Sequence, residues 1–234
     1  AGATVNLEYS TNNGTGWNTI ANGVAATNET YVWAPAFAHA AVLWRVVNAT
    51  NAACASTNAK PFSVRPTTNT AFQFYVNDGS TANGSYCSEI GNDANSGAAS
   101  NAPKATLQAI LNAYSLRGGD VVYVDTGDYL LTQTVSVGSF DSGLAGMPVR
   151  IVGSDKGTLF NRGNTTADVL DLTGASHLEI ENLRLTGGRY GLIGGTANIT
   201  VRNVWMVGNV YGVYLTGGAH VFERCVSADN TTSA

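Results

Sequence analysis

Three aspartates, Asp120, Asp125 and Asp128, lie close together in the chain and form its best candidate acidic group. Carboxylates gathered in this way are the groups that general acid–base chemistry and Ca²⁺ binding require. A catalytic role is one interpretation of this group, and a structural role in the first coil is the other.

A second group of oxygen donors occurs in a long polar loop. Asn92, Asp93 and Asn95 could bind Ca²⁺, but their spacing matches no complete calcium loop, and turn chemistry is the favoured explanation. The three histidines take part in no serine–histidine–aspartate, metal-ligand or phosphate-loop pattern. We therefore expect no metal and no cofactor, with Ca²⁺ as an unsupported alternative.

The chain has three cysteines and no C-x-x-C motif, so zinc and thioredoxin-type chemistry are unsupported. Cys54 and Cys87 could form one disulfide if the protein is extracellular. Cys225 falls on an inward position of the repeat described below, and we expect it to be a small buried hydrophobic residue.

An outward aromatic set is the more suggestive candidate for ligand or partner contact. It consists of Arg184, Tyr190, Trp205, Tyr211 and Tyr214. Rings on a flat β-surface can stack on sugar faces or pack against a partner, and an arginine beside a tryptophan forms a cation–π pair. Stabilisation of the fold by an aromatic ladder is the alternative.

These residues belong to an internal repeat. The segment 178–187 aligns with 199–208 at a constant offset of 21, and a third pass follows, so the coils are clearest at 178–230. Apolar residues alternate within each short segment, which indicates β-strands, and Asn182 and Asn203 mark the corners between strands. Self-similarity at such a period is the signature of a solenoid with one repeat per coil.

Stacked coils predict columns of side chains. Two inward columns are expected: Ile180, Val201 and Phe222, and Leu183, Val204 and Cys225. Glu181, Arg202 and Glu223 form one outward column whose alternating charges cancel, and Glu179 lies over Thr200 without a second carboxylate. No carboxylate cage for a metal is expected on this face.

One convincing helix precedes the repeat, at about 103–116. Pro103 suits a first turn, apolar residues recur at helical spacing through Tyr114, and Gly118-Gly119 stops the helix. Its amphipathic pattern predicts that it covers the first coil.

The N-terminal segment 1–68 has a different pattern of short strands, expected at 4–9, 17–20, 31–33, 42–47 and 61–64. Strands at this spacing predict a small β-sandwich with Trp17, Trp33 and Trp44 in its core, although a recognition role for the tryptophans stays open. A polar connector at 65–70 separates this domain, 1–68, from the second, 69–234.

Two resemblances follow from these segments. The first domain, through Gly16-Trp17-Asn18-Thr19-Ile20 and Tyr31-Val32-Trp33-Ala34-Pro35, resembles the immunoglobulin-like or fibronectin-like accessory modules of bacterial surface and secreted proteins, which usually act as spacers or binders. From the helix through the segment Gly119–Tyr129, the second domain resembles the right-handed parallel β-helix, or pectin-lyase-like, superfamily. That resemblance implies an N-terminal capping helix, and it implies that Asp120, Asp125 and Asp128 form turns of the first coil and are not catalytic. It specifies fold better than activity. The expected fold class is all-β.

The composition limits the classes of partner that can be expected. Charged residues are only 12% of the 234, and the net charge of −4 shows no basic run, so nucleic acid is not expected as a partner. No apolar stretch approaches a membrane span, so no membrane insertion is expected. A start at Ala1, without a leader, and seven Asn-x-Ser/Thr sequons favour a secreted or cell-surface protein.

The leading functional expectation is a non-catalytic structural or adhesive protein of the cell exterior. Phe222, Cys225 and Val226 form an uncapped coil edge, which predicts head-to-tail self-association into a filament. The alternative is the N-terminal part of a pectin-lyase-like polysaccharide lyase or glycoside hydrolase. Polysaccharide is a conceivable ligand in both hypotheses.

Overall fold

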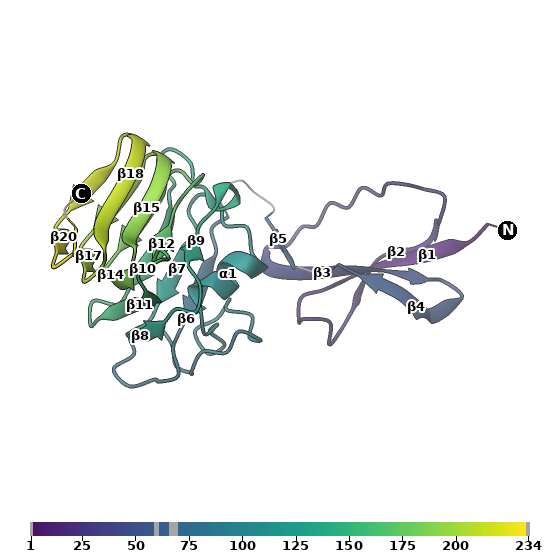
Figure 1. The fold of residues 1–234 in the computed structure, drawn as a ribbon. Coiled ribbons are helices and arrows are strands. Elements are labelled where there is room, and N and C mark those ends of the chain that lie inside the picture. The colour runs from purple at the N-terminus through teal and green to yellow at the C-terminus, as the bar shows by residue number, and fades with distance from the viewer. Residues whose placement is uncertain (1, 59–60, 66–69, 233–234) are drawn as a thin grey trace. The chain divides into compact units, whose positions relative to one another are not determined.

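The chain divides into two compact units, 1–70 and 71–234. The computed structural model describes residues 2–58, 61–65 and 70–232. Nearly all regular structure in both units is β-strand, as the ribbon shows (Figure 1). Each unit is described separately below.

The first unit is an antiparallel sheet with the strand order β2-β1-β3-β4. The strand β4 pairs with the C-terminal half of β3, and β5 pairs with its N-terminal half. The strands are β1 (Thr4–Ser10), β2 (Asn18–Ala25), β3 (His39–Asn48), β4 (Asn51–Thr57) and β5 (Phe62–Val64). Leu7 lies opposite Val46, and Glu8 lies opposite Arg45. Because side chains alternate along a strand, these pairs point to opposite faces of the sheet.

Three expectations for this unit are wrong. The segment Tyr31–Trp33 is irregular, and the described strands of this unit all belong to one sheet instead of the two that a sandwich needs. The ring of Trp33 packs against those of Tyr9 and Phe62, so side-chain contacts and not strand pairing hold this segment against the sheet. The tryptophans do not form a buried core either: Trp44 is 42% exposed, and the other two expected there are half-buried.

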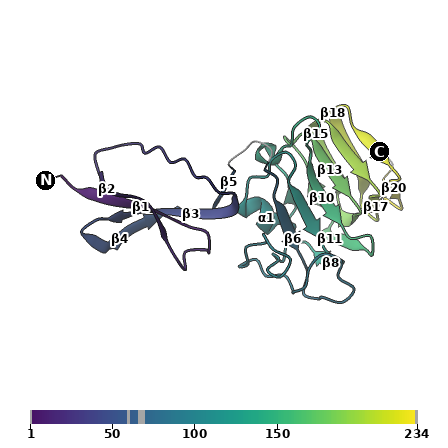
Figure 2. The ribbon, with the colours of Figure 1, turned by 180° about the vertical axis from the view of Figure 1, so that it is seen from behind.

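The second unit consists of three parallel sheets, and the ribbon views show their strands stacked one after another along the unit (Figure 1 and Figure 2). Sheet one contains β6 (Gln73–Val76), β7 (Val121–Val124), β10 (Val149–Gly153), β13 (Leu178–Glu181), β16 (Ile199–Arg202) and β19 (Val221–Glu223). Sheet two contains β8 (Gly127–Leu130), β11 (Thr158–Asn164), β14 (Arg184–Gly188), β17 (Trp205–Val207) and β20 (Val226–Ala228). Sheet three contains β9 (Val135–Ser136), β12 (Leu170–Asp171), β15 (Tyr190–Ala197) and β18 (Tyr211–Gly218). From β7 to β18 the chain visits the three sheets in turn, so each of these passes adds one strand to each sheet.

The later passes pair in the register that the repeat predicts. Ile180 pairs with Val201, and Val201 pairs with Phe222. The corner residues Asn182 and Asn203 adopt positive φ angles of 56° and 52°, and their side chains hydrogen-bond at 2.8 Å. Asparagine tolerates this left-handed conformation better than most residues, which explains its place between two short strands.

The core of this unit lies between the sheets. Ile180 and Val201 are fully buried, and Leu183 and Val204 of the second column are at most 2% exposed. Phe222 is 43% exposed, and Cys225 is half-buried rather than buried as expected. The third pass therefore continues the inward columns but lies at their uncovered end.

The helix α1 (Leu107–Ala113) is shorter than the expected 103–116. It begins after Thr106, whose hydroxyl accepts a hydrogen bond from the amide of Ala109 at 3.1 Å. Pro103 stands before this cap, where its carbonyl accepts a bond from the amide of Asn92. The ring of Tyr114 follows the helix and lies 4.6 Å from that of Phe74 on the edge strand β6.

Candidate functional site

Two of the three clustered aspartates are structural. Asp120 is fully buried, and its carboxylate accepts hydrogen bonds from the amides of Phe72 at 2.8 Å and Arg117 at 2.9 Å. It thereby ties the start of the second unit to the turn before β7. A buried carboxylate engaged in this way has no access to substrate.

Asp125 is also fully buried and organises the long loop before the helix. Its carboxylate accepts hydrogen bonds of 2.6–3.1 Å from the amides of Ser85, Tyr86, Cys87 and Thr126. Burial acts to raise the pKa of Asp125, but the four amide bonds outweigh it and hold the pKa below its ordinary value. The residue is an anionic anchor for the loop backbone.

Asp128 differs from the other two because it is exposed and lines a cleft. This polar cleft has a volume of about 480 Å³, and its charged lining residues are Asp78, Asp128, Lys156 and Arg184. Asp78 is oriented by a 2.7 Å hydrogen bond from the amide of Ser80, and the Lys156 ammonium donates to the carbonyl of Gly84 at 3.2 Å. Two carboxylates and two cations therefore share one open cleft.

The cleft opens onto a column of outward side chains across sheet two. Successive register pairs join Asp128, Leu159, Arg184, Trp205 and Val226. We refer to this row as the Asp128–Val226 column. Its five side chains span four strand spacings, about 19 Å, which suits an extended ligand better than a single ring. Trp205 presents the largest apolar surface of the row, at 49% exposure.

The predicted aromatic set falls on two sheets. Arg184 and Trp205 belong to the column on sheet two, whereas Tyr190, Tyr211 and Tyr214 lie on sheet three. The rings of Tyr190 and Tyr211 stack at 4.7 Å, and Tyr214 lies 5.8 Å from Tyr190.

A cation–π contact is present beside these tyrosines, and it is made by Arg189, which the sequence pattern did not single out. Its guanidinium lies 5.4 Å from the ring centre of Tyr190. The same guanidinium forms two hydrogen bonds, of 2.9 and 2.8 Å, to the carboxylate of Asp168. The bidentate pair fixes the arginine over the ring, so the aromatic group on sheet three is well ordered.

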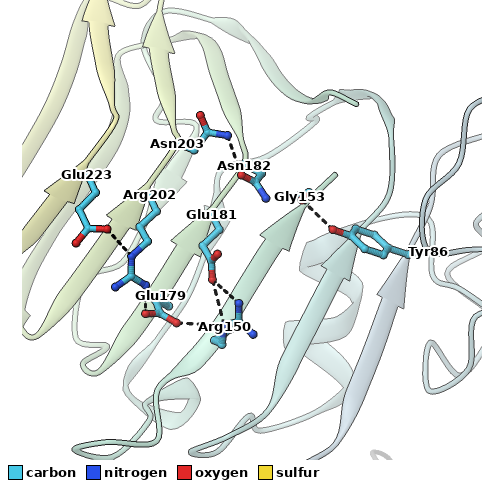
Figure 3. Close-up of polar contacts among 9 residues, drawn as sticks. All are labelled: Tyr86, Arg150, Gly153, Glu179, Glu181, Asn182, Arg202, Asn203 and Glu223. Carbon is cyan, nitrogen blue, oxygen red and sulfur yellow. Dashed lines mark hydrogen bonds and ion pairs between the residues drawn. The ribbon is translucent and has the colours of Figure 1, made fainter. Parts of the chain in front are cut away.

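The outward face of sheet one carries a ladder of charges, shown in Figure 3. Arg150 binds Glu179 at 3.1 Å and Glu181 at 2.6 Å, while Arg202 binds Glu179 and, at 2.8 Å, Glu223. Glu181 and Arg202 are register partners, as expected. Arg202 nevertheless pairs diagonally with Glu179, and the cation bound to Glu181 is Arg150. Hydrogen bonds to Glu223 and Glu179 raise the pKa of Arg202. The carboxylates of this face are therefore engaged in ion pairs.

In the polar loop that contains Asn92, Asp93 and Asn95, side-chain oxygens accept hydrogen bonds from nearby backbone amides. Asp93 accepts hydrogen bonds from the amides of Ala105 and Thr106, just before helix α1, and Asn92 accepts one from the amide of Ala94. Within residues 2–58, 61–65 and 70–232, no group of three or more metal-binding side chains is present. No helix in the same ranges is long and apolar enough to cross a membrane.

The two cysteines of the possible disulfide, Cys54 and Cys87, belong to different units. Cys54 is an exposed free thiol on β4, and Cys87 is a half-buried free thiol whose Sγ lies 3.7 Å from the carbonyl oxygen of Val76. Burial raises the pKa of Cys87, and the negative charge of Asp125 raises it further, to about 12. Cys87 is therefore protonated at neutral pH and is a poor nucleophile.

The predicted assembly edge lies on the last strands of sheets one and two. Phe222 is 43% exposed, its neighbour Val221 is 44% exposed, and Cys225 and Val226 are half-buried. The Sγ atom of Cys225 contacts the carbonyl oxygen of Val201 at 3.3 Å. An apolar strip is thus open to solvent at this edge.

Comparison with known proteins yields no matching family model and no matching curated protein. Among solved structures, a GH136 lacto-N-biosidase from Eubacterium ramulus is similar, with 21% identity and a TM-score of 0.46 over 67% of this chain. A structure described as a rhamnogalacturonan lyase is similar with 18% identity and a TM-score of 0.40, again over 67% of this chain. The chain spans 30% of the length of the first structure and 51% of the second.

Proposed function

We propose that the second unit is a right-handed parallel β-helix of the pectin-lyase-like class and the carbohydrate-facing part of a secreted polysaccharide lyase or glycoside hydrolase. The observation that carries this proposal is the polar cleft, which opens onto the Asp128–Val226 column. The three parallel sheets, which gain one strand per pass, support the fold assignment. A surface of this length and chemistry suits an extended glycan.

The column combines the chemical groups that glycan recognition needs. Trp205 offers a half-exposed ring on which a sugar face can stack, and Arg184 beside it can bind sugar hydroxyls or a carboxylate. Leu159 adds apolar contact between Arg184 and Asp128. In this proposal the glycan lies across the strands of sheet two, with one end in the polar cleft.

Bond cleavage would take place in the polar cleft. In a hydrolase, one of Asp78 and Asp128 would protonate the departing glycosidic oxygen while the other carboxylate activates a water molecule. In a lyase, Lys156 would remove a proton next to a sugar carboxylate, and the glycosidic oxygen would leave as a carbon–carbon double bond forms. The cleft contains the charged groups for either reaction, and the products decide between the two.

Binding to the column can be tested by alanine substitution. We expect Trp205→Ala and Arg184→Ala each to weaken binding to a responsive polysaccharide about tenfold, since each removes one major contact of roughly 1–3 kcal/mol. The measurement is affinity electrophoresis or calorimetry against a panel of neutral and acidic polysaccharides. Thr200→Ala, on the outward face of sheet one, is the control and should bind as the unmodified chain does. Equal binding by all three variants would contradict the proposal.

Cleavage is tested separately with Asp78→Asn and Asp128→Asn. New reducing ends without unsaturated products indicate a hydrolase, and unsaturated uronide products indicate a lyase. If the activity is that of a hydrolase, we expect both aspartate variants to lose most of it while binding to the same polysaccharide persists. If it is that of a lyase, we expect Lys156→Ala to lose most of it instead, again with binding retained. If polysaccharide is bound but never cleaved, the non-enzymatic adhesive role is favoured instead.

Head-to-tail self-association is a second proposal, and the exposed strip at Val221 and Phe222 supports it. We expect sedimentation velocity at micromolar concentration to show species larger than a monomer, and electron microscopy to show filaments. Phe222→Asp should reduce this association, because it places a charge in the contact. A monomer at every concentration tested would rule the association out.

A further inference from the structure

A large apolar cavity lies within the first unit. It has a volume of about 550 Å³ and is bounded on one side by the sheet and on the other by the irregular segment 26–38, which we refer to as the arch. Cavities of about 300–1,000 Å³ with mostly apolar walls are typical of small-molecule sites.

The floor of the cavity is one face of the sheet. It is formed by Val5, Leu7, Ile20, Val24 and Val46 of strands β1, β2 and β3. Aromatic side chains from the sheet edge and the arch form the walls, namely Tyr31, Trp33, Trp44 and Phe62. The opposite face of the same strands is polar at Glu8 and Arg45, which form a 2.6 Å ion pair. The cavity therefore lies on the face opposite this ion pair.

Ring contacts hold the arch over this face. Trp33 lies 5.2 Å from Tyr9 and 6.5 Å from Phe62, and Phe37 stacks on Tyr9 at 5.1 Å between ring centres. With the arch in this position, a second sheet or a folded partner cannot pack flat on the floor. The space that remains is limited in volume, which fits a small molecule.

One end of the cavity is polar. Asn28, Glu29 and Thr30 of the arch line it, and Glu29 carries the only charge among the described lining residues. An anionic ligand would meet this carboxylate unfavourably, whereas an amine or hydroxyl group would be attracted to it.

We propose that this cavity binds a small, largely apolar molecule that carries an amine or hydroxyl group at one end. The apolar body would lie on Leu7 and Val46 between the walls of Trp33 and Trp44. The polar group would lie beside Glu29. This site lies in the first unit and is independent of the glycan surface proposed for the second.

The test uses the full chain and the neutral fluorophore N-phenyl-1-naphthylamine, which is apolar and carries one N–H group. We expect saturable binding in the micromolar range, with a rise in probe fluorescence. Val24→Phe fills the floor and should weaken binding at least tenfold. Thr19→Phe adds the same ring on the opposite face, where Thr19 pairs with Glu8, and should leave binding unchanged. No saturable binding, or equal binding by both variants, would overturn the proposal.

A second comparison does not depend on the folding of the filled variant. The anionic probe 8-anilinonaphthalene-1-sulfonate should bind at least several-fold more weakly than the neutral probe, and Glu29→Gln should reduce that difference. If the two probes bind equally before and after the substitution, the polar end has no part in recognition and the proposed ligand class is wrong.

Discussion

Replacement of Asp125 by asparagine is expected to lower the free energy of unfolding by roughly 2–4 kcal/mol at neutral pH, because its carboxylate accepts several amide hydrogen bonds. Hydrogen bonds to a charged group contribute about 1.5–3 kcal/mol each, although four on one carboxylate are not additive. Asparagine has one acceptor oxygen, and its NH₂ group would face amide donors at the positions that the second oxygen now serves. For a unit of this size the corresponding fall in Tm is roughly 4–16 °C.

The effect of Asp125 has a defined pH dependence. Because the pKa of Asp125 is lower in the folded chain than in the unfolded chain, its stabilisation is present above the unfolded pKa and is lost as pH falls through the folded pKa. The unmodified chain and Asp125→Asn should therefore converge in stability on acidification. Denaturant titrations at a series of pH values measure this, with the exposed Asp128→Asn as the control. A stability difference that is absent at neutral pH, or independent of pH, would contradict the anchoring role.

Replacement of Ile180 by alanine is expected to cost about 3–4 kcal/mol, because it leaves a cavity in a fully buried column. Phe222→Ala removes a larger side chain from the same column but from its exposed end, and we expect it to cost less than about 2 kcal/mol. Comparison of the two variants tests whether the coils stack as described and whether a second copy of the chain covers the edge at Phe222.

Urea unfolding at two protein concentrations gives the two free energies. If Ile180→Ala is nearly neutral, the inward column is not packed as described. If Phe222→Ala costs as much as Ile180→Ala and the cost grows with protein concentration, a second copy covers the edge. This second outcome would support self-association by a measurement independent of sedimentation.

The later coils could be predicted from the sequence because they repeat at a constant offset. The inward columns, the asparagine corners and the pairing of Arg184 with Trp205 all follow from aligning one pass with the next. The position of the helix was also predictable from its apolar spacing, although its first turn was not. Asp93 accepts hydrogen bonds from the two amides just before the helix and so holds the N-cap residue Thr106 in place, and the helical pattern gives no sign of this contact.

The earlier coils share no single offset across the three sheets, and none of their offsets is the 21 of the later repeat, so alignment at 21 does not predict their pairing. Arg150 lies 29 residues before its register partner Glu179, and it was therefore missed as a member of the charge ladder. For the same reason, the sequence did not predict the register that places Asp128 beside Leu159 and Leu159 beside Arg184. The candidate glycan surface depends on these two pairs.

The sequence alone determined where the strands of the regular repeat lie and which of their side chains point inward, because alternation and period are local properties of the chain. Only the tertiary structure decided the roles of the aspartates. Asp125 is an anchor because the amides of residues 85–87, far from it in the chain, converge on it, while Asp128 is exposed beside Asp78 and Lys156. Such roles depend on burial and on partners brought together by folding, and three carboxylates of one residue type carry no local sign of that difference.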